Sequence, residues 1–333
     1  MRITSNAIYS QFSSNLRSIQ ERQARDNIRV YTGKNMVDLA DDPSAVNDIQ
    51  YFTENINRNN NYIKNIDSTL DEQLSTEGAL ENIANTLDEV RSTGIQAMEV
   101  GNQDKLPVLG ESVKKLLTSM VNTANNQYNG AYTLVGTKTT AQALTPTAPE
   151  ITKLPFELVQ DTPTSSNPSG LRVTFKGNFS SRNINVGPNA SEEVNSTADD
   201  AFGTGGVEAF NNVIKLYNTL TYKPDGTLRS TGDKAGLTKN ERDAISDEIV
   251  GINNSMELVN QETGRMGARQ ARLQNLRDLM NEDNSRMKEF RSQKEDTDVA
   301  QAIMEMQKDE TALQYSLKVG SKLMSQSLLD FLG

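Results

Sequence analysis

Acidic side chains are the groups most able to do chemistry in this 333-residue chain. There are 44 Asp and Glu residues against 34 Lys and Arg, and neither histidine nor cysteine occurs. The chain therefore has no imidazole acid or base, no thiolate nucleophile, no disulfide and no Cys or His metal ligand. Carboxylates stand close together at Asp41 and Asp42, and again at Glu295, Asp296 and Asp298. Two carboxylates could act as general acid and base, and three could bind a hard cation.

None of these patterns is specific. Among 44 acids some must be neighbours by chance, and Asp41 with Asp42 stands directly before a proline, as helix caps often do. The cluster at 295–298 lacks the glycine and terminal glutamate of an EF-hand loop. The three glycines within 203–206 resemble a phosphate-binding loop, but no Lys-Ser/Thr follows them, so a linker is favoured. The sequence predicts neither an enzyme nor a cofactor or metal site.

Composition suits a thin helical structure better than a thick globular core. Only 35% of the residues are hydrophobic, 5% are aromatic and tryptophan is absent. The net charge of −10 argues against the basic face that nucleic-acid binding requires. Residues 1–60 carry 7 basic and 7 acidic side chains, so this end could pack beside copies of itself. No apolar run reaches 18 residues and the start has no signal-like apolar stretch, so we expect neither membrane insertion nor a cleaved secretory signal.

Apolar residues at helical spacing gather at both ends of the chain. In the first segment they stand at Tyr9, Phe12, Leu16, Ile19 and Val30, with Gln23 and Asp26 as polar breaks. In the last segment, which Glu310 and Gly320 interrupt, they are Val299, Ile303, Met306, Leu313, Leu317, Met324, Leu328 and Phe331. Steps of three and four predict an amphipathic helix at each end.

A corner is predicted at residues 31–46, YTGKNMVDLADDPSAV, between the first helix and a much longer one. Gly33 stands where a helix C-terminus often needs positive φ. Asp42 can cap the next helix, and Pro43 has a preset φ that suits its first turn. A second break is predicted at 292–298, SQKEDTD, where Asp296 or Thr297 can cap the last helix.

Between the two ends the pattern changes twice. Helical periodicity continues to about 100 and returns at 113–121, whereas 138–206 is rich in Thr, Ser, Pro, Asn and Gly with short β-type runs, LRVTF and RNINV. A short helix around EAFNNVIKLYNTL precedes heptads from Ile245 to Met287. We therefore predict a mainly α fold with a small β-rich insert, an elongated antiparallel helical rod whose N- and C-terminal helices pair. The predicted divisions are 1–40, 41–137, 138–206, 207–292 and 293–333.

Neither terminal helix can be stable alone. Burying the five apolar side chains of the first helix gains roughly 8–15 kcal/mol, at about 1.5–3 each. Ordering its backbone costs about 1–2 kcal/mol per residue, which helical hydrogen bonds offset only in part. The apolar residues of both end stripes are therefore the predicted assembly interface, with the paired ends packing on further chains and becoming helical on assembly. An intramolecular bundle with 44–129 and 240–292 is the alternative.

Five segments, in the same order, resemble the flagellin-like hook-associated protein 3 family, the FlgL-type junction proteins of bacterial flagella. They are MRITSNAIYSQF at 1–12, YTGKNMVDLADDPSAV at 31–46, NNQYNGAYTLVGTKT at 125–139, GRMGARQARLQNL at 264–276 and SLLDFL at 327–332. The resemblance implies a structural subunit, exported unfolded through the flagellar type III system and secreted to the hook-filament junction. Its partners would be hook-associated protein 1, flagellin, copies of itself in a ring and an export chaperone at the C-terminal helix.

Carried onto this sequence, the resemblance assigns Asp41, Asp42 and Pro43 to the tight turn between an inner helix and a rod. Residues 299–331 would form the C-terminal inner helix, with Phe12 and Leu16 facing it, and the insert would point outward. Flagellin is the nearest alternative, although SQKEDTDVA at 292–300 departs from the flagellin pattern and SLLDFL favours the junction protein. A coiled-coil adaptor that does not polymerise is a further alternative, but adaptors usually have polar tails rather than apolar helices at both ends.

Overall fold

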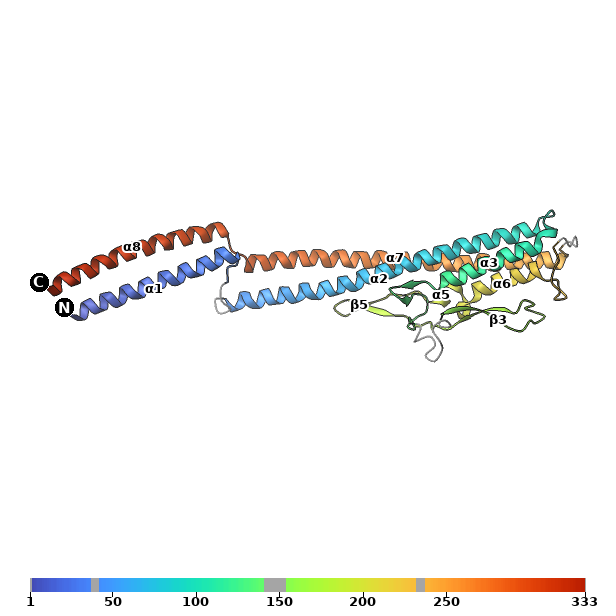
Figure 1. The fold of residues 1–333 in the computed structure, drawn as a ribbon, viewed down its shortest axis with the longest axis horizontal. Coiled ribbons are helices and arrows are strands. Elements are labelled where there is room, and N and C mark those ends of the chain that lie inside the picture. The colour runs from blue at the N-terminus through green and yellow to red at the C-terminus, as the bar shows by residue number, and fades with distance from the viewer. Residues whose placement is uncertain (1, 37–41, 141–153, 232–236, 333) are drawn as a thin grey trace. The chain divides into compact units, whose positions relative to one another are not determined.

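Long helices dominate the computed structural model (Figure 1). It describes residues 2–36, 42–140, 154–231 and 237–332, with side chains except at 2–6, 8, 103 and 323–332. The chain divides into two compact units, which we call the terminal unit, Met1–Asn60 with Leu279–Gly333, and the central unit, Asn61–Asp278. In the described residues the helices and a few short strand pairs confirm the predicted mainly α fold with a small β-rich insert.

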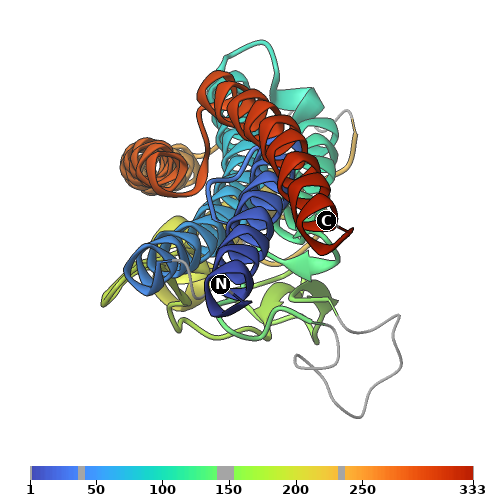
Figure 2. The same ribbon diagram turned by 90° about the vertical axis from the view of Figure 1, so that its left-hand side faces the viewer.

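The terminal unit is built from both ends of the sequence. Its α1 (Arg2–Thr32) and α8 (Val299–Leu332) lie side by side and antiparallel, as Figures 1 and 2 show. It also contains the first part of α2 (Pro43–Met98) and the last part of α7 (Lys239–Glu295). These two contact each other through the rings of Phe52 and Phe290, whose centroids are 5.9 Å apart. The contact between α1 and α8 confirms the predicted pairing of the N- and C-terminal helices.

The central unit holds the apolar core. The helices α2, α3 (Leu106–Ala124), α6 (Glu208–Thr221) and α7 share one continuous cluster of buried side chains. The α3 helix follows a short turn η1 (Gln103–Lys105) and begins earlier than the sequence predicted, because Pro107 suits a first helical turn. The heptads of α7 point inward at Ile245, Ile252, Val259, Met266 and Leu273.

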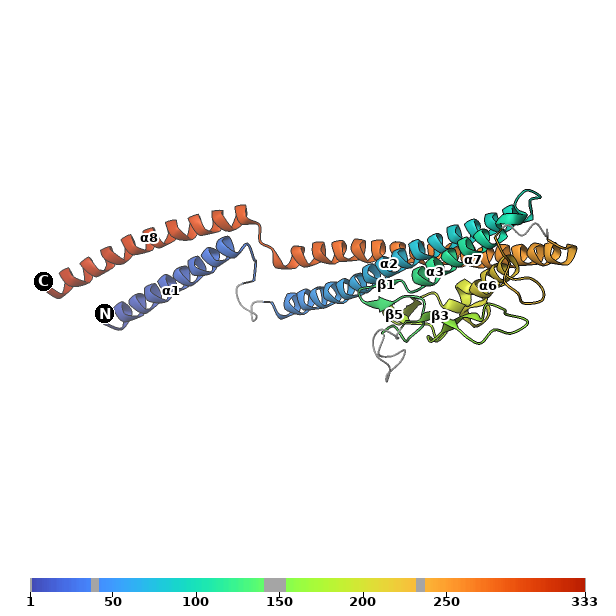
Figure 3. The same ribbon diagram turned by 45° about the vertical axis from the view of Figure 1, so that its right-hand side comes forward.

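Antiparallel strand pairs make up the described β structure (Figure 3). The pairs are β1 (Gln127–Tyr128) with β2 (Ala131–Tyr132), β3 (Phe156–Gln160) with β4 (Leu171–Phe175), and β5 (Asn183–Gly187) with β6 (Ala190–Glu193). The β3–β4 pair packs on the helices through Phe156, whose ring centroid lies 5.5 Å from that of Phe210 in α6. This contact fixes the insert to the core of the central unit.

The end of the insert is helical, which the sequence analysis did not predict. A short helix α5 (Ala198–Phe202) lies in the predicted β-rich insert, and a 3-10 turn η3 (Thr204–Gly206) occupies the glycine segment interpreted as a linker. Thr197 supplies the reason, because its hydroxyl oxygen accepts from the Asp200 amide and so caps α5. Among the described helices none is both long and apolar enough to cross a membrane.

Candidate assembly surface

The contact between α1 and α8 is a seam with coiled-coil spacing. The ring of Phe12 lies against Gly320, and Arg22 lies against Asp309, so the residue numbers rise along α1 as they fall along α8. Buried and half-buried side chains recur in steps of four and three on both helices. We define the seam as Phe12, Leu16, Ile19, Gln23, Asp26 and Val30 of α1 with Ala302, Met306, Asp309, Leu313, Ser316 and Gly320 of α8.

The seam is poor in large apolar side chains. Four of its twelve positions are polar, at Gln23, Asp26, Asp309 and Ser316, and two more are Ala302 and Gly320. Because the hydrophobic gain follows the apolar area removed from water, this pair stabilises itself less than a fully apolar seam would. The structure thus leaves the terminal helices closed on each other along one narrow strip.

The predicted interface residues fall into three groups. Phe12, Leu16, Ile19, Val30, Met306 and Leu313 are half-buried at seam positions. Outside the seam the structure places Tyr9, Val299, Ile303 and Leu317, which we call the outer apolar set. Their exposure is substantial, 57% for Tyr9 and 53% for Leu317. The side chains of Met324, Leu328 and Phe331 lie outside the described residues.

Further exposed apolar side chains lie on these helices that the sequence analysis did not select. Tyr31 is 93% exposed at the end of α1, and α8 exposes Met304, Tyr315 and Val319 as well. The α8 residues are spaced by eleven and then four, which places them on one face of a helix turned away from the seam. That spacing was present in the sequence and could have revealed a second apolar stripe.

The chain passes from α1 toward α2 near residue 33 and from α7 to α8 near residue 296, and we call these two places the crossings. Hydrogen bonds at the predicted corner join one crossing to the other. Gly33 ends α1 with a φ of +70°, and its amide donates to the Arg29 carbonyl at 2.8 Å. Its own carbonyl accepts from the Thr297 amide at 2.9 Å, while the Asn35 amide donates to the Glu295 carbonyl at 2.8 Å. The Lys34 ammonium pairs with the Glu295 carboxylate. The crossings near 33 and 296 therefore form a small antiparallel bridge, which the sequence did not predict.

Carboxylates cap both helices that leave these crossings. Asp42 Oδ1 accepts from the amides of Ser44 and Ala45 at 3.0 Å, and Pro43 is the first residue of α2. Asp41 lies outside the described residues. The cap of α8 is Asp298, whose Oδ1 accepts from the Ala300 and Gln301 amides at 2.9 and 3.1 Å.

The prediction of Asp296 or Thr297 as the cap of α8 was wrong. The Thr297 amide donates to the Gly33 carbonyl, and the Asp296 carboxylate accepts from the Ser292 hydroxyl at the end of α7. Asp298 directly precedes the first residue of α8, so only this carboxylate stands at the Ncap position.

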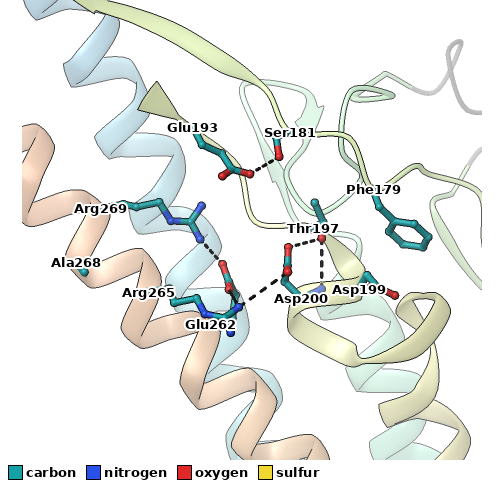
Figure 4. A pocket seen from close by; sticks show the side chains of 10 residues that line it. All are labelled: Phe179, Ser181, Glu193, Thr197, Asp199, Asp200, Glu262, Arg265, Ala268 and Arg269. Carbon is teal, nitrogen blue, oxygen red and sulfur yellow. Dashed lines mark hydrogen bonds and ion pairs between the residues drawn. The ribbon is translucent and has the colours of Figure 1, made fainter. Parts of the chain in front are cut away.

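An open groove of about 590 Å³ lies in the central unit, and Figure 4 shows the side chains that line it. Its carboxylates are engaged by neighbouring protein groups. Glu262, which is 1% exposed, accepts from the Ser196 hydroxyl at 2.6 Å and pairs with Arg265 and Arg269. Asp200 accepts from the Thr197 hydroxyl at 2.5 Å. These hydrogen bonds and ion pairs therefore join α5 and the insert to α7.

The nearby glycines do not form a phosphate cradle. The Gly205 amide donates to the Asp199 carboxylate at 2.8 Å, and the Thr204 amide donates to Glu208 at 2.9 Å. Protein carboxylates therefore occupy the donors that a phosphate would need. In the described part of the chain, no cluster of three or more acidic side chains is placed to hold a metal ion.

Comparison with known proteins found a family model and several solved structures that resemble the chain. Residues 249–332 match the family model of the bacterial flagellin C-terminal helical region. No curated protein matches the chain at a significant level. A solved structure from Vibrio parahaemolyticus, assigned as a flagellar hook-associated protein, has a TM-score of 0.61 at 17% identity, covering 77% of this chain and 100% of that one.

Two structures from Legionella pneumophila are also similar. Flagellar hook-associated protein 3 has a TM-score of 0.56 at 14% identity over 73% of this chain and 97% of that one. The flagellar junction protein FlgL has a TM-score of 0.52 at 15% identity over 74% of this chain and 99% of that one. These likenesses confirm, for the fold, the resemblance found in the sequence motifs. The chain therefore shares its fold with these hook-associated proteins, and its residues 249–332 match the model of the bacterial flagellin C-terminal helical region.

Proposed function

We propose that this protein is a structural subunit of the bacterial flagellum that joins hook-associated protein 1 to the flagellin filament. It forms a ring with copies of itself, and the paired terminal helices make the contacts between subunits. The observation that carries the proposal is the outer apolar set, which stays exposed on a helix pair whose own seam is narrow.

Exposed apolar area on both terminal helices supports assembly through this surface. Covering one large apolar side chain gains about 1.5–3 kcal/mol, so the outer apolar set offers a substantial driving force for association. The outer apolar set includes Tyr9 of α1 and three residues of α8, namely Val299, Ile303 and Leu317. A neighbouring subunit that covers all four would therefore favour the state in which α1 and α8 are paired. A neighbouring copy carries the same stripes and can supply the missing surface.

Export and partners rest on the resemblance. A chain without cysteine has no disulfide to break before passing unfolded through a narrow channel, which fits type III export. The exposed apolar side chains of α8 fit a chaperone that covers this helix until assembly. The protein would then be secreted and reside at the hook-filament junction.

Immunolabelling of isolated flagella tests the location. We expect label confined to the boundary between hook and filament. Label along the whole filament would overturn the junction assignment in favour of flagellin, which the family match over residues 249–332 makes the second candidate.

Paired substitutions test the assembly surface. Ile303→Asp with Leu317→Asp places charge on the outer apolar set and should abolish filament attachment while far-ultraviolet circular dichroism stays unchanged. The matched control, Gln301→Asp with Thr311→Asp, adds the same charge at exposed polar positions of α8 and should attach normally. Normal attachment by the first variant would remove this surface from the proposal.

A further inference from the structure

Two carboxylates are buried within the seam. Asp26 of α1 is 6% exposed and Asp309 of α8 is 9% exposed, and both stand at positions that heptad spacing assigns to the interior. Burying a carboxylate between helices is costly unless a cation and hydrogen bonds compensate for it. The presence of two such groups in so thin a seam needs a physical reason.

Arginines of α1 surround these carboxylates unequally. Arg22 holds Asp309 with two parallel contacts, Nε to Oδ2 at 3.0 Å and Nη2 to Oδ1 at 3.3 Å. Arg29 lies 3.7 Å from Asp26 and 3.9 Å from Glu305 of α8, so it is shared between two carboxylates. Asp309 therefore has a directed fork, whereas the contact of Asp26 with Arg29 is longer and is shared with Glu305.

The charge on Asp26 is incompletely compensated. Burial raises the pKa of Asp26 above its ordinary value, and the carboxylates of Asp309 and Glu305 raise it further. Arg29 and Arg22 oppose this shift without cancelling it. A buried ion pair is often no more stabilising than apolar side chains of similar volume, so pairing specificity explains this polar layer better than stability does.

We propose that Arg22, Asp309 and Asp26 select the register in which α1 pairs with α8. Steps of seven leave an apolar stripe unchanged, so the large residues of the seam tolerate a slide of one heptad. The polar layer does not tolerate it, because a slide moves Asp309 about 10 Å from Arg22. This inference concerns pairing within one chain and holds whether or not the protein sits at the flagellar junction.

The two directions of sliding fail for related reasons. If α8 slides one heptad toward the N-terminus of α1, Asp309 faces Leu16 and no longer contacts Arg22. If α8 slides one heptad the other way, Asp309 faces Val30 and Asp26 faces Leu313, so Arg29 alone must pair with both carboxylates. Each shifted register buries a carboxylate with less positive charge than the observed one does, and this difference makes the observed register the preferred one.

Cysteine cross-linking of the full chain in dilute solution tests the proposal, because introduced cysteines are the only thiols present. Ile19→Cys with Leu313→Cys reports the observed register, and Ile19→Cys with Met306→Cys or Gly320→Cys reports a shift of one heptad either way. In the parent chain we expect intramolecular cross-links at the first pair, with the shifted pairs at least about tenfold weaker. Comparable cross-linking at all three pairs, or none at the first, would overturn the proposal.

Apolar replacement then separates register from stability. Asp26→Leu with Asp309→Leu should raise the shifted cross-links about tenfold. Gln23→Leu with Ser316→Leu fills two other polar seam positions and should leave the register unchanged, which controls for added apolar area. An unchanged register in the first variant, or an equal loss of register in the control, would contradict the assignment.

Charge exchange provides an independent measurement. Arg22→Glu should scatter the register as the apolar variant does, and adding Asp309→Arg should restore it by recreating the pair in reverse. Failure of this rescue would overturn the role of the fork. All these readouts come from single chains, so they are independent of filament attachment and of the proposed location.

Discussion

The α3–α6 pair and the α1–α8 pair show two ways for helices to meet. The buried side of α3 consists of apolar residues and Gly110, and it packs on Phe210, Val213 and Leu220 of α6. The α1–α8 seam instead mixes half-buried apolar residues with buried carboxylates. The apolar side chains between α3 and α6 are buried within the chain, whereas α1 and α8 leave large apolar side chains exposed to solvent.

The same difference holds for the two units as a whole. The main cluster of buried hydrophobic side chains lies entirely within the central unit. In the described part of the terminal unit, the buried hydrophobic side chains are Ala45, Ile56 and Ala302. The central unit therefore has the continuous apolar core of an independently folding domain, and the terminal unit does not.

A large truncation in each unit should separate them most clearly. Phe210→Ala removes a fully buried ring that packs on Phe156 and Phe202, so the central unit should lose about 3–5 kcal/mol of unfolding free energy. Phe12→Ala removes a half-buried ring from the seam and should leave the central transition unchanged. Urea unfolding followed by circular dichroism, with hydrogen exchange resolved by peptide, measures both. Equal losses from the two variants would erase the contrast between the units.

The half-buried carboxylate of Glu248 should make the stability of the central unit depend on pH. Burial raises the pKa of Glu248 to about 7, opposed by the Thr219 hydroxyl and Lys215 and aided by Asp247. Because the folded-state pKa lies above the unfolded value, the folded state is relatively favoured at low pH, and stability falls as pH rises from about 4.5 to about 7.

Glu248→Gln should remove that fall and stabilise the protein at pH 8 by up to about 3 kcal/mol, at about 1.4 kcal/mol per pKa unit. At pH 4 the variant and the parent should be nearly equal. Denaturant midpoints at the two pH values measure the difference. An identical pH profile in both proteins would remove Glu248 as its cause.

Two glycines test how rigid each helix pair is. A Cβ on Gly110 of α3 would overlap the buried Thr221 hydroxyl of α6, so Gly110→Ala should cost about 1–3 kcal/mol. A Cβ on Gly320 would meet only the far edge of the Phe12 ring, which can turn aside. Gly320→Ala should therefore be nearly neutral, since alanine also favours the helix. Thermal unfolding of both variants compares them, and a larger loss at Gly320 would show the seam to be the tighter contact.

The smallest expected effect is local to α8. Asp298→Ala removes the cap that accepts from two amides, at a cost of about 0.5–2 kcal/mol. Faster hydrogen exchange should appear in the first turn of α8 and not in the central unit. Asp296→Ala is the matched control, and it should leave that turn protected because Asp296 bonds to Ser292 instead.

Local patterns fixed a large part of the fold before any tertiary information. The corner glycine, the strand LRVTF and the helix around EAFNNVIKLYNTL all follow from short-range rules, namely positive φ, β propensity and amphipathic spacing. The cap of α8 was missed because three polar residues in a row satisfy the same rule. The tertiary structure places Asp298 directly before α8, while the Thr297 amide bonds to Gly33 and the Asp296 carboxylate bonds to Ser292.

The sequence by itself determined that both ends are amphipathic helices with apolar stripes of matching period, because helical spacing is a local property of the chain. Only the tertiary structure decided which residues of each stripe are covered by the other terminal helix. Steps of three and four fit two neighbouring edges of a helix, so Met306 and Leu313 fell inside the seam while Ile303 and Leu317 stayed in solvent. The side of a stripe that meets a partner depends on where that partner stands, and its position is set by contacts between residues nearly three hundred apart in the sequence.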